Sequence, residues 1–180
     1  FLERRIAKGE RKGSLDEADD PFEGARKVCR LAKPGGFVAI GLYSALARDH
    51  LKPGKALGRQ YTPETVREFR QAIIDSAHDD PVRAPAVASR DFYASSGCRD
   101  LLMHVQEHEM NFDDLRRMLR ENDLTFLGFI QYTFKEIRDP YRAMFPQDPE
   151  GLDLDCWEAF EAAHPATFRR MYQFWARKAG

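Results

Sequence analysis

The sequence predicts an α/β fold, and three observations support that class. Residues 19–36, DDPFEGARKVCRLAKPGG, combine an acidic N-cap, a proline at the first helical position, apolar residues at helical spacing and a Pro-Gly-Gly stop. The continuous apolar run FVAIGLY, residues 37–43, follows directly and is typical of a strand buried on both faces. Two further strands are predicted in LTFLGFIQY, residues 124–132, and in MYQFWAR, residues 171–177. A helix, a tight turn and a buried strand in succession indicate an α/β arrangement.

Three other segments are predicted to be helical. TPETVREFRQAII, residues 62–74, begins with a capping threonine and a proline and has one apolar face. A short helix is predicted from residue 95 or 96 to about residue 105, and NFDDLRRMLRENDL, residues 111–124, repeats the capping pattern. Residues 78–89, which are rich in Asp, Pro and Ala, are predicted to form a loop.

Composition limits the class of partner. The 180 residues are 43% hydrophobic, and 28 Lys and Arg nearly balance 29 Asp and Glu, so one soluble domain with no nucleic-acid and no membrane partner is expected. The longest apolar stretch, residues 37–47, is shorter than the roughly 20 residues that a membrane helix needs. Cys29, Cys98 and Cys156 are far apart, which predicts buried thiols in a reducing cytoplasm and neither disulfides nor a cysteine zinc site.

Three longer stretches carry a family resemblance. DDPFEGARKVCRLAKPGGFVAIGLYS, SGCRDLLMHVQEHEMNFDDLRRMLRENDLTFLGF and FRRMYQFWARK resemble, in that order, the segments around strands five, six and seven of class I S-adenosylmethionine-dependent methyltransferases. The resemblance covers residues 13–178 and is greatest to a bacterial subgroup often joined to tetratricopeptide repeats. It implies the C-terminal half of a Rossmann-like sheet with helical insertions, a last antiparallel strand in a hairpin with the sixth, and S-adenosylmethionine as cofactor.

The family's main cofactor elements are missing from this sequence. No early apolar strand is followed by a glycine-rich loop, and GSLDEADDP, residues 13–21, has Asp16 and Glu17 where the family usually has two histidines. Gly13 and Leu15 are the only candidate cofactor contacts that the resemblance leaves. Residues 1–19 are therefore expected to be a charged segment of uncertain structure, and residues 20–180 the C-terminal part of a methyltransferase domain excised from a longer protein. Such a piece is expected to bind the cofactor weakly or not at all.

The pentapeptide HVQEH, residues 104–108, raises an alternative. H-x-x-E-H is the inverted zincin pattern, in which His104 and His108 would bind zinc and Glu107 would activate a water molecule. Glu158 or Glu161 could supply a third ligand. The pattern is short, and its surroundings match the methyltransferase segment, so no metal is predicted and a zinc metallopeptidase is a remote alternative.

Candidate substrate-binding residues come from two places. Ligands of α/β sheets bind beyond the carboxyl ends of the strands, and Tyr43 and Ser44 are predicted to lie there. The alternative interpretation is that Tyr43 packs in the core and that Ser44 only stabilises the turn. The resemblance implies that the segment before strand six borders the acceptor site, and either histidine there could act as a base; structural hydrogen bonding is the alternative for each residue. The candidates in this segment are Arg99, Asp100, His104, Glu107 and His108.

Three functions remain open from the sequence. The first is S-adenosylmethionine-dependent methyl transfer to an unknown acceptor, a small molecule or a protein, with no catalytic residue assigned because methyl transfer needs mainly alignment. The second is a degenerate methyltransferase fold that acts as a protein-binding or assembly module. The third is the metallopeptidase. A half-sheet is also expected to leave an edge or an apolar face uncovered, which predicts self-association.

Overall fold

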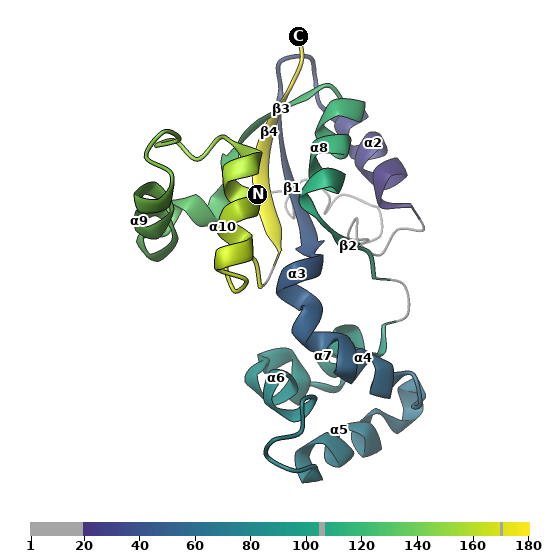
Figure 1. The fold of residues 1–180 in the computed structure, drawn as a ribbon. Helices are drawn as coiled ribbons and strands as arrows, with labels where there is room; N and C mark the ends of the chain where they lie inside the picture. Colours follow the sequence, from purple (N-terminus) through teal and green to yellow (C-terminus); the bar gives the residue numbers. More distant parts are fainter. Residues whose placement is uncertain (1–19, 105–106, 170) are drawn as a thin grey trace. The chain divides into compact units, whose positions relative to one another are not determined.

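The computed structural model describes residues 20–104, 107–169 and 171–180 and divides the chain into two compact units (Figure 1). Residues 1–47 and 108–180 form the first, here called the sheet unit, and residues 48–107 form the second, the helical unit. The predicted N-terminal segment, with Gly13 and Leu15, lies outside the described residues. Each unit has its own core of buried apolar side chains.

The first predicted helix and strand are present in the sheet unit. Helix α2 (Pro21–Leu31) begins at Asp20, whose carboxylate accepts the backbone N–H of Phe22 at 2.9 Å. The Pro-Gly-Gly turn follows, in which Gly35 has a φ of +72°, a conformation that favours glycine. Strand β1 (Phe37–Ser44) then runs through the centre of the unit.

The sheet has the strand order β2-β1-β4-β3. Strand β4 (Tyr172–Lys178) lies between β1 and β3 (Leu124–Phe129) and is antiparallel to both, so the predicted C-terminal hairpin is confirmed. The short β2 (Glu109–Met110) pairs in parallel with the carboxyl end of β1. Strand β3 ends three residues before the predicted position, because the register shifts at Gly128, φ +113°, and residues 130–133 form a 3-10 turn.

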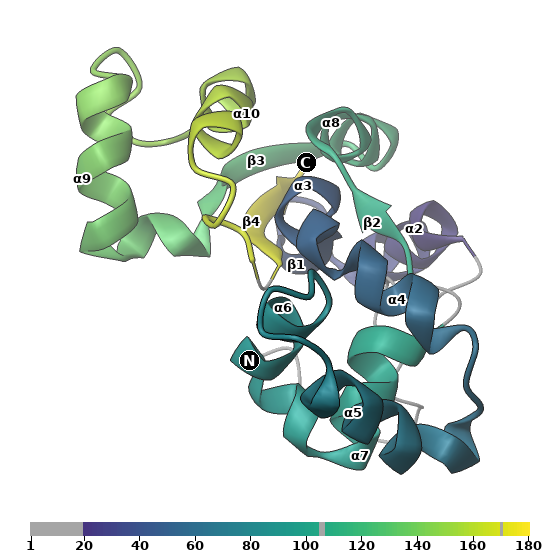
Figure 2. The ribbon, with the colours of Figure 1, turned by 60° about the horizontal axis from the view of Figure 1, so that its bottom comes forward.

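Helices α2, α8 (Phe112–Glu121) and α10 (Leu154–Ala163) contribute to one core on one face of the sheet (Figure 2). Helix α9 (Lys135–Met144) adds the buried Tyr141, which stacks on Trp157 of α10 with ring centroids 4.1 Å apart. Helix α8 begins with a reciprocal capping box, because Asn111 and Asp114 each accept the backbone N–H of the other. These aromatic and aliphatic contacts fix α10 above the strands.

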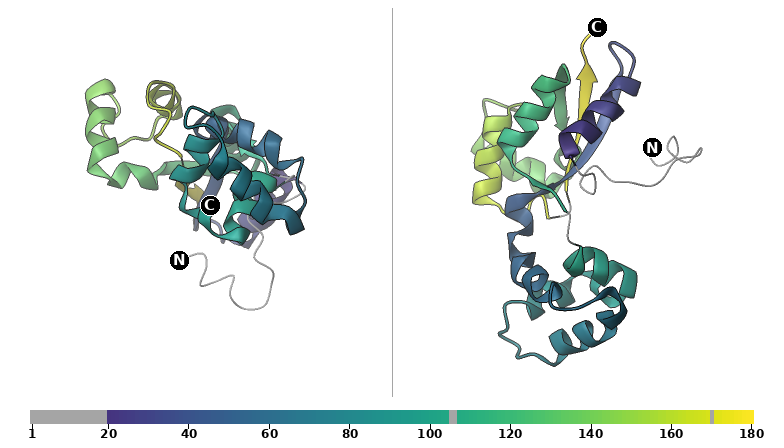
Figure 3. Two further views of the ribbon diagram at one scale, coloured as in Figure 1. Left: turned by 90° about the horizontal axis from the view of Figure 1, so that it is seen from below. Right: turned by 90° about the vertical axis from the view of Figure 1, so that its right-hand side faces the viewer.

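The helical unit consists of short helices around a separate core (Figure 3). They are α4 (Lys52–Gly58), α5 (Val66–Asp75), α6 (Arg83–Ala88), α7 (Ser95–Cys98) and a π-helical turn (Arg99–Met103), and α3 (Ala45–Arg48) leads into them. Helix α4 packs closely on that turn, since a Cβ built on Gly58 would lie 2.1 Å from the carbonyl oxygen of Leu102. Close approach therefore requires glycine here.

Two sequence predictions are wrong in this unit. The predicted loop at residues 78–89 contains α6, because Pro85 falls in the first turn, where no backbone N–H is needed, and the alanines favour a helix. The helix predicted to reach residue 105 ends at Met103, where His104 takes extended backbone angles of φ −72° and ψ 126°.

Candidate functional site

The carboxyl end of β1 carries a buried polar cluster of three side chains, Ser44, Glu161 and Tyr172. Ser44 donates its hydroxyl proton to Oε1 of Glu161 at 2.5 Å, and Tyr172 donates to Oε2 at 2.7 Å. The residues are 0%, 3% and 1% exposed, respectively. Because β1, α10 and β4 each contribute one member, the cluster joins β1 to two elements near the end of the sequence, and Ser44 and Glu161 are 117 positions apart.

Local sequence places each member of this cluster. Alternation along β1 directs Ser44 to the core face, where its Oγ also accepts the backbone N–H of Ala47 at 3.0 Å and so caps α3. Glu161 follows Trp157 by four residues, so both lie on the buried side of α10. Tyr172 is the first residue of β4 and faces the same core.

Burial controls the electrostatics of the cluster. Burial raises the pKa of Glu161, and the hydrogen bonds from Ser44 and Tyr172 lower it in part. Burial and the neighbouring Glu161 carboxylate together raise the pKa of Tyr172. The carboxylate is enclosed and holds two hydroxyl donors, so its chemistry is that of a buried acceptor that fixes the turn after β1.

Sequence reasoning identified Ser44 but missed Glu161 and Tyr172 as parts of this site. The sequence suggests Glu161 only as a third zinc ligand, and it suggests Tyr172 only as part of the predicted strand at residues 171–177. A signal for Glu161 existed, because an acid one turn from Trp157 on a buried helix face needs a partner. The partners themselves could not be read from the sequence.

Glu107 of HVQEH is held inside the helical unit. Nη2 of Arg48 donates to its two carboxylate oxygens at 2.8 and 2.9 Å, and Lys55 donates to Oε2. The side chains of Arg48 and Glu107 are each 7% exposed. Since Arg48 is the first residue of the helical unit and Glu107 the last, this buried ion pair joins the two ends of the unit.

The other predicted substrate residues are divided between the units. Tyr43 and His108, both partly buried, belong to the sheet unit with Ser44. The helical unit holds Glu107 and three exposed residues, Arg99, Asp100 and His104. Their roles in substrate binding stay predictions.

The geometry of HVQEH argues against the zincin reading. Because the preceding helix ends at Met103, His104 and His108 do not share a helix face, which the pattern requires. Glu158 accepts a hydrogen bond from Arg116, and Glu161 belongs to the buried cluster. Within residues 20–104, 107–169 and 171–180, no group of three or more His, Cys, Asp or Glu side chains is placed to hold a metal ion.

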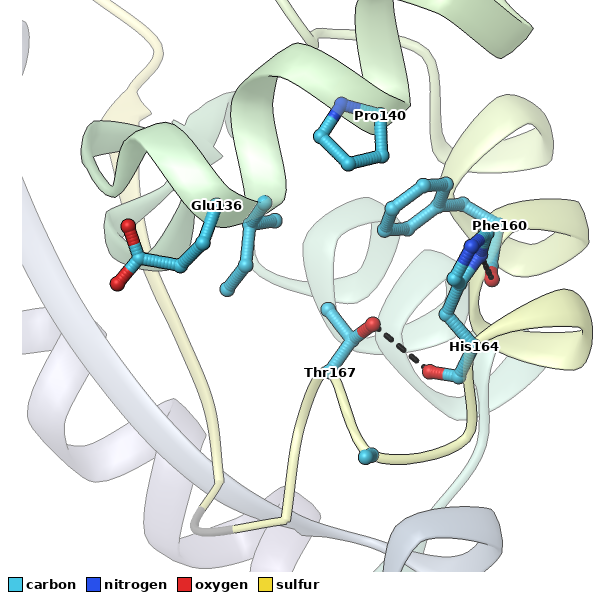
Figure 4. A pocket seen from close by; sticks show the side chains of 7 residues that line it. Glu136, Pro140, Phe160, His164 and Thr167 are labelled. Carbon is cyan, nitrogen blue, oxygen red and sulfur yellow. Dashed lines mark hydrogen bonds between the residues drawn. The ribbon is translucent and has the colours of Figure 1, made fainter.

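A pocket of about 260 Å³ opens between α9 and α10 (Figure 4). Pro140 and Phe160 supply apolar walls, and the ring of His164 stacks on Phe160 with centroids 4.4 Å apart. Glu136 lies on the side opposite His164. None of the residues predicted from the sequence lines this pocket.

The family holds its cofactor with a glycine-rich turn between a strand and a helix N-terminus, and the described residues do not form such a turn. The glycines with positive φ are Gly35 before β1, Gly128 in β3 and Gly151 before α10. Gly58 lies in α4 and serves helix packing. No step of a reaction is therefore assigned to a cofactor held by these residues.

The fold defines a class: a mixed α/β sheet whose last strand is reversed and inserted beside β1 is methyltransferase-like. Among solved structures, PKMT2 from Rickettsia typhi in complex with AdoHcy is similar, with a TM-score of 0.58 and 12% sequence identity. The alignment covers 95% of this chain and 37% of that chain, so this chain spans little more than a third of its neighbour. No family model and no curated protein matches the sequence. Among the described helices, none is long and apolar enough to cross a membrane.

Proposed function

We propose that this chain contributes the C-terminal strands and a helical module to an S-adenosylmethionine-dependent methyltransferase. The observation that carries the proposal is the antiparallel β4 beside β3, which the family resemblance implied; the likeness of the fold to PKMT2 over 95% of this chain supports it. AdoHcy, bound in that neighbour, is the product that S-adenosylmethionine leaves after methyl transfer. The cytoplasm remains the proposed compartment.

The cofactor is proposed to be held mainly outside the described residues. Their glycines serve turns, a bulge and helix packing, as described above. Isothermal titration of S-adenosylmethionine into the 180-residue chain should therefore give no micromolar binding. The same titration into the natural polypeptide that contains this sequence should give binding, and AdoHcy should compete.

A protein amino group is the acceptor class to test first, because PKMT2 is a protein lysine methyltransferase. The natural polypeptide should transfer a labelled methyl group from S-adenosylmethionine to protein in an extract, and acetylation of the lysines in the extract before the reaction should prevent this labelling. Labelled small molecules with unlabelled protein would favour a small-molecule acceptor. Failure of both cofactor binding and transfer in the natural polypeptide would refute the methyltransferase proposal.

A non-catalytic assembly module is the second candidate function. Two observations favour it: the described residues lack the cofactor loop, and the polar side chains at the end of β1 are enclosed and hydrogen-bonded to one another. This alternative predicts a stable fold and protein association without any methyl transfer. The titration with the natural polypeptide separates the two candidates.

A further inference from the structure

The pocket between α9 and α10 contains none of the residues considered above for methyl transfer, and its whole lining belongs to the sheet unit (Figure 4). Its volume of about 260 Å³ is below the roughly 300–1,000 Å³ of pockets that hold drug-sized ligands, so it suits one short chain. Four lining residues supply carbon surface: Ile137, Pro140, Phe160 and Ala166. A ligand that fills the pocket therefore needs an apolar body.

Two polar side chains of the lining are left as hydrogen-bond acceptors. Oγ1 of Thr167 donates its proton to the carbonyl oxygen of His164 at 2.7 Å, so only its lone pairs remain for a ligand. Nδ1 of His164 lies 3.3 Å from the carbonyl oxygen of Phe160. Because a carbonyl oxygen only accepts, the ring proton of this contact is on Nδ1, and Nε2 of the neutral ring is an acceptor.

Glu136 adds a carboxylate on the side opposite His164. Its side chain is exposed, and within the part of the chain that the structure describes no ion pair or hydrogen bond occupies it, since the neighbouring Lys135 pairs with Asp139 instead. The backbone adds a further acceptor. Pro140 follows Glu136 by four residues inside α9 and has no N–H, so the carbonyl oxygen of Glu136 lacks its usual helical donor.

We propose that this pocket binds an aliphatic ammonium ion. An ammonium group has three donors and no acceptor, which complements the acceptors of the lining, and an aliphatic chain complements the carbon walls. A carboxylate ligand would bring acceptors against acceptors, and a purely apolar ligand would leave the polar groups without a partner. Both a lysine side chain of a peptide and a free alkyl diamine have this chemistry. The inference does not rest on the proposed methyl transfer.

Methyl NMR of the 180-residue chain, titrated with n-pentylammonium chloride at pH 8, tests the proposal. The methyl signals of Ile137 and Ala166, which line the pocket, should shift with a Kd on the order of 1 mM, as expected for so small a ligand. The methyl signals of Ile73, in the core of the helical unit, should not move. Pentanoate, which has the opposite charge on a similar chain, should bind at least about tenfold more weakly.

Two variants separate the charge of the pocket from its shape. Glu136→Gln should weaken the binding of pentylammonium roughly three- to fivefold, because it removes an exposed ionic partner. Glu150→Gln is the matched control, since Glu150 is an exposed acid of the same unit outside the pocket, and it should leave the Kd unchanged. Ala166→Leu, at an exposed turn position, should fill the pocket and abolish the shifts at Ile137. Circular dichroism confirms that each variant is folded.

Competition identifies the source of the ammonium group. Displacement of pentylammonium by the capped peptide Ac-Gly-Lys-Gly-amide would assign the pocket to a lysine side chain, and displacement by 1,5-diaminopentane alone would assign it to a free diamine. Displacement by neither would overturn the proposal. Equal affinities for pentylammonium and pentanoate, no shift at Ile137, or an unchanged Kd in Glu136→Gln would each do the same.

Discussion

Replacing Glu161 with leucine tests whether the buried cluster holds the sheet unit together. The substitution leaves the hydroxyls of Ser44 and Tyr172 buried without their acceptor. Each buried donor without a partner costs about 1–3 kcal/mol, and removal of the enclosed carboxyl offsets part of this, so Glu161→Leu should lower the free energy of unfolding by about 2–4 kcal/mol. Trp157 and Trp175, the two tryptophans, lie in the sheet unit, so urea unfolding followed by tryptophan fluorescence reports on this unit.

The triple variant Ser44→Ala, Glu161→Leu and Tyr172→Phe is the control. It removes all three polar groups together, and an apolar replacement of a whole network can be nearly neutral. Its loss of stability should therefore be smaller than that of Glu161→Leu alone. If the single variant loses less than about 1 kcal/mol, or if the triple variant is the less stable of the two, the cluster does not hold the unit by hydrogen bonding.

The pH dependence of the same cluster has a definite sign. Burial raises the pKa of Glu161 above its ordinary value of 4.5, so the folded state favours the neutral acid. Its contribution to stability is full below pH 4.5 and is lost as the pH rises through the folded-state pKa. Compared with Glu161→Gln, which cannot titrate, the wild-type chain should thus lose stability from about pH 4.5 upward. An unchanged difference between the two across this range would contradict the assignment.

Three further outcomes concern the helical unit. Glu107→Gln breaks a buried ion pair and should lower the stability of this unit by about 3–5 kcal/mol. Amide hydrogen exchange should then become faster in the helical unit but not in the sheet unit. Asp49→Asn, at a side chain that is 64% exposed, is the control and should change the exchange little. Gly58→Ala should cost at least about 1–3 kcal/mol by the same measurement, because the new methyl group meets the backbone of Leu102; unchanged exchange would refute close packing there. Burial raises the pKa of Cys98 to about 11, so iodoacetamide at pH 8 should modify it only after urea unfolding, and rapid modification of the folded chain would contradict its burial.

The sequence allowed the local features of the fold to be predicted. Helix α2 and strand β1 were found because their caps, turn and apolar run act within neighbouring residues. The order of β1, β4 and β3 came from the family resemblance, since period and propensity do not specify which strands pair. Helix α6 was missed because proline and aspartate were taken as loop signals, although tertiary burial of Ala86 and the first-turn position of Pro85 permit a helix.

The site was less predictable, because its partners are distant along the chain. Ser44 and Glu161 are separated by 117 positions, and Arg48 and Glu107 by 59. No local pattern reports such pairs. HVQEH shows the converse problem: its letters match a helical metal motif, but the backbone leaves the helix at Met103 before the motif begins. The spacing of a metal motif has chemical meaning only when its residues lie on the helix that the motif requires.

The central position of β4 has a consequence for how this fold is made during synthesis. Strands β1 and β3 do not pair with each other, and both depend on the strand that comes last in the sequence. The polypeptide therefore leaves the ribosome with β3 unpaired and with β1 paired only to the short β2, and the sheet closes only when residues 172–178 emerge. A chain that stops before residue 172 has the helices and two of the long strands but no means of joining them, and it remains a target for chaperones and proteases.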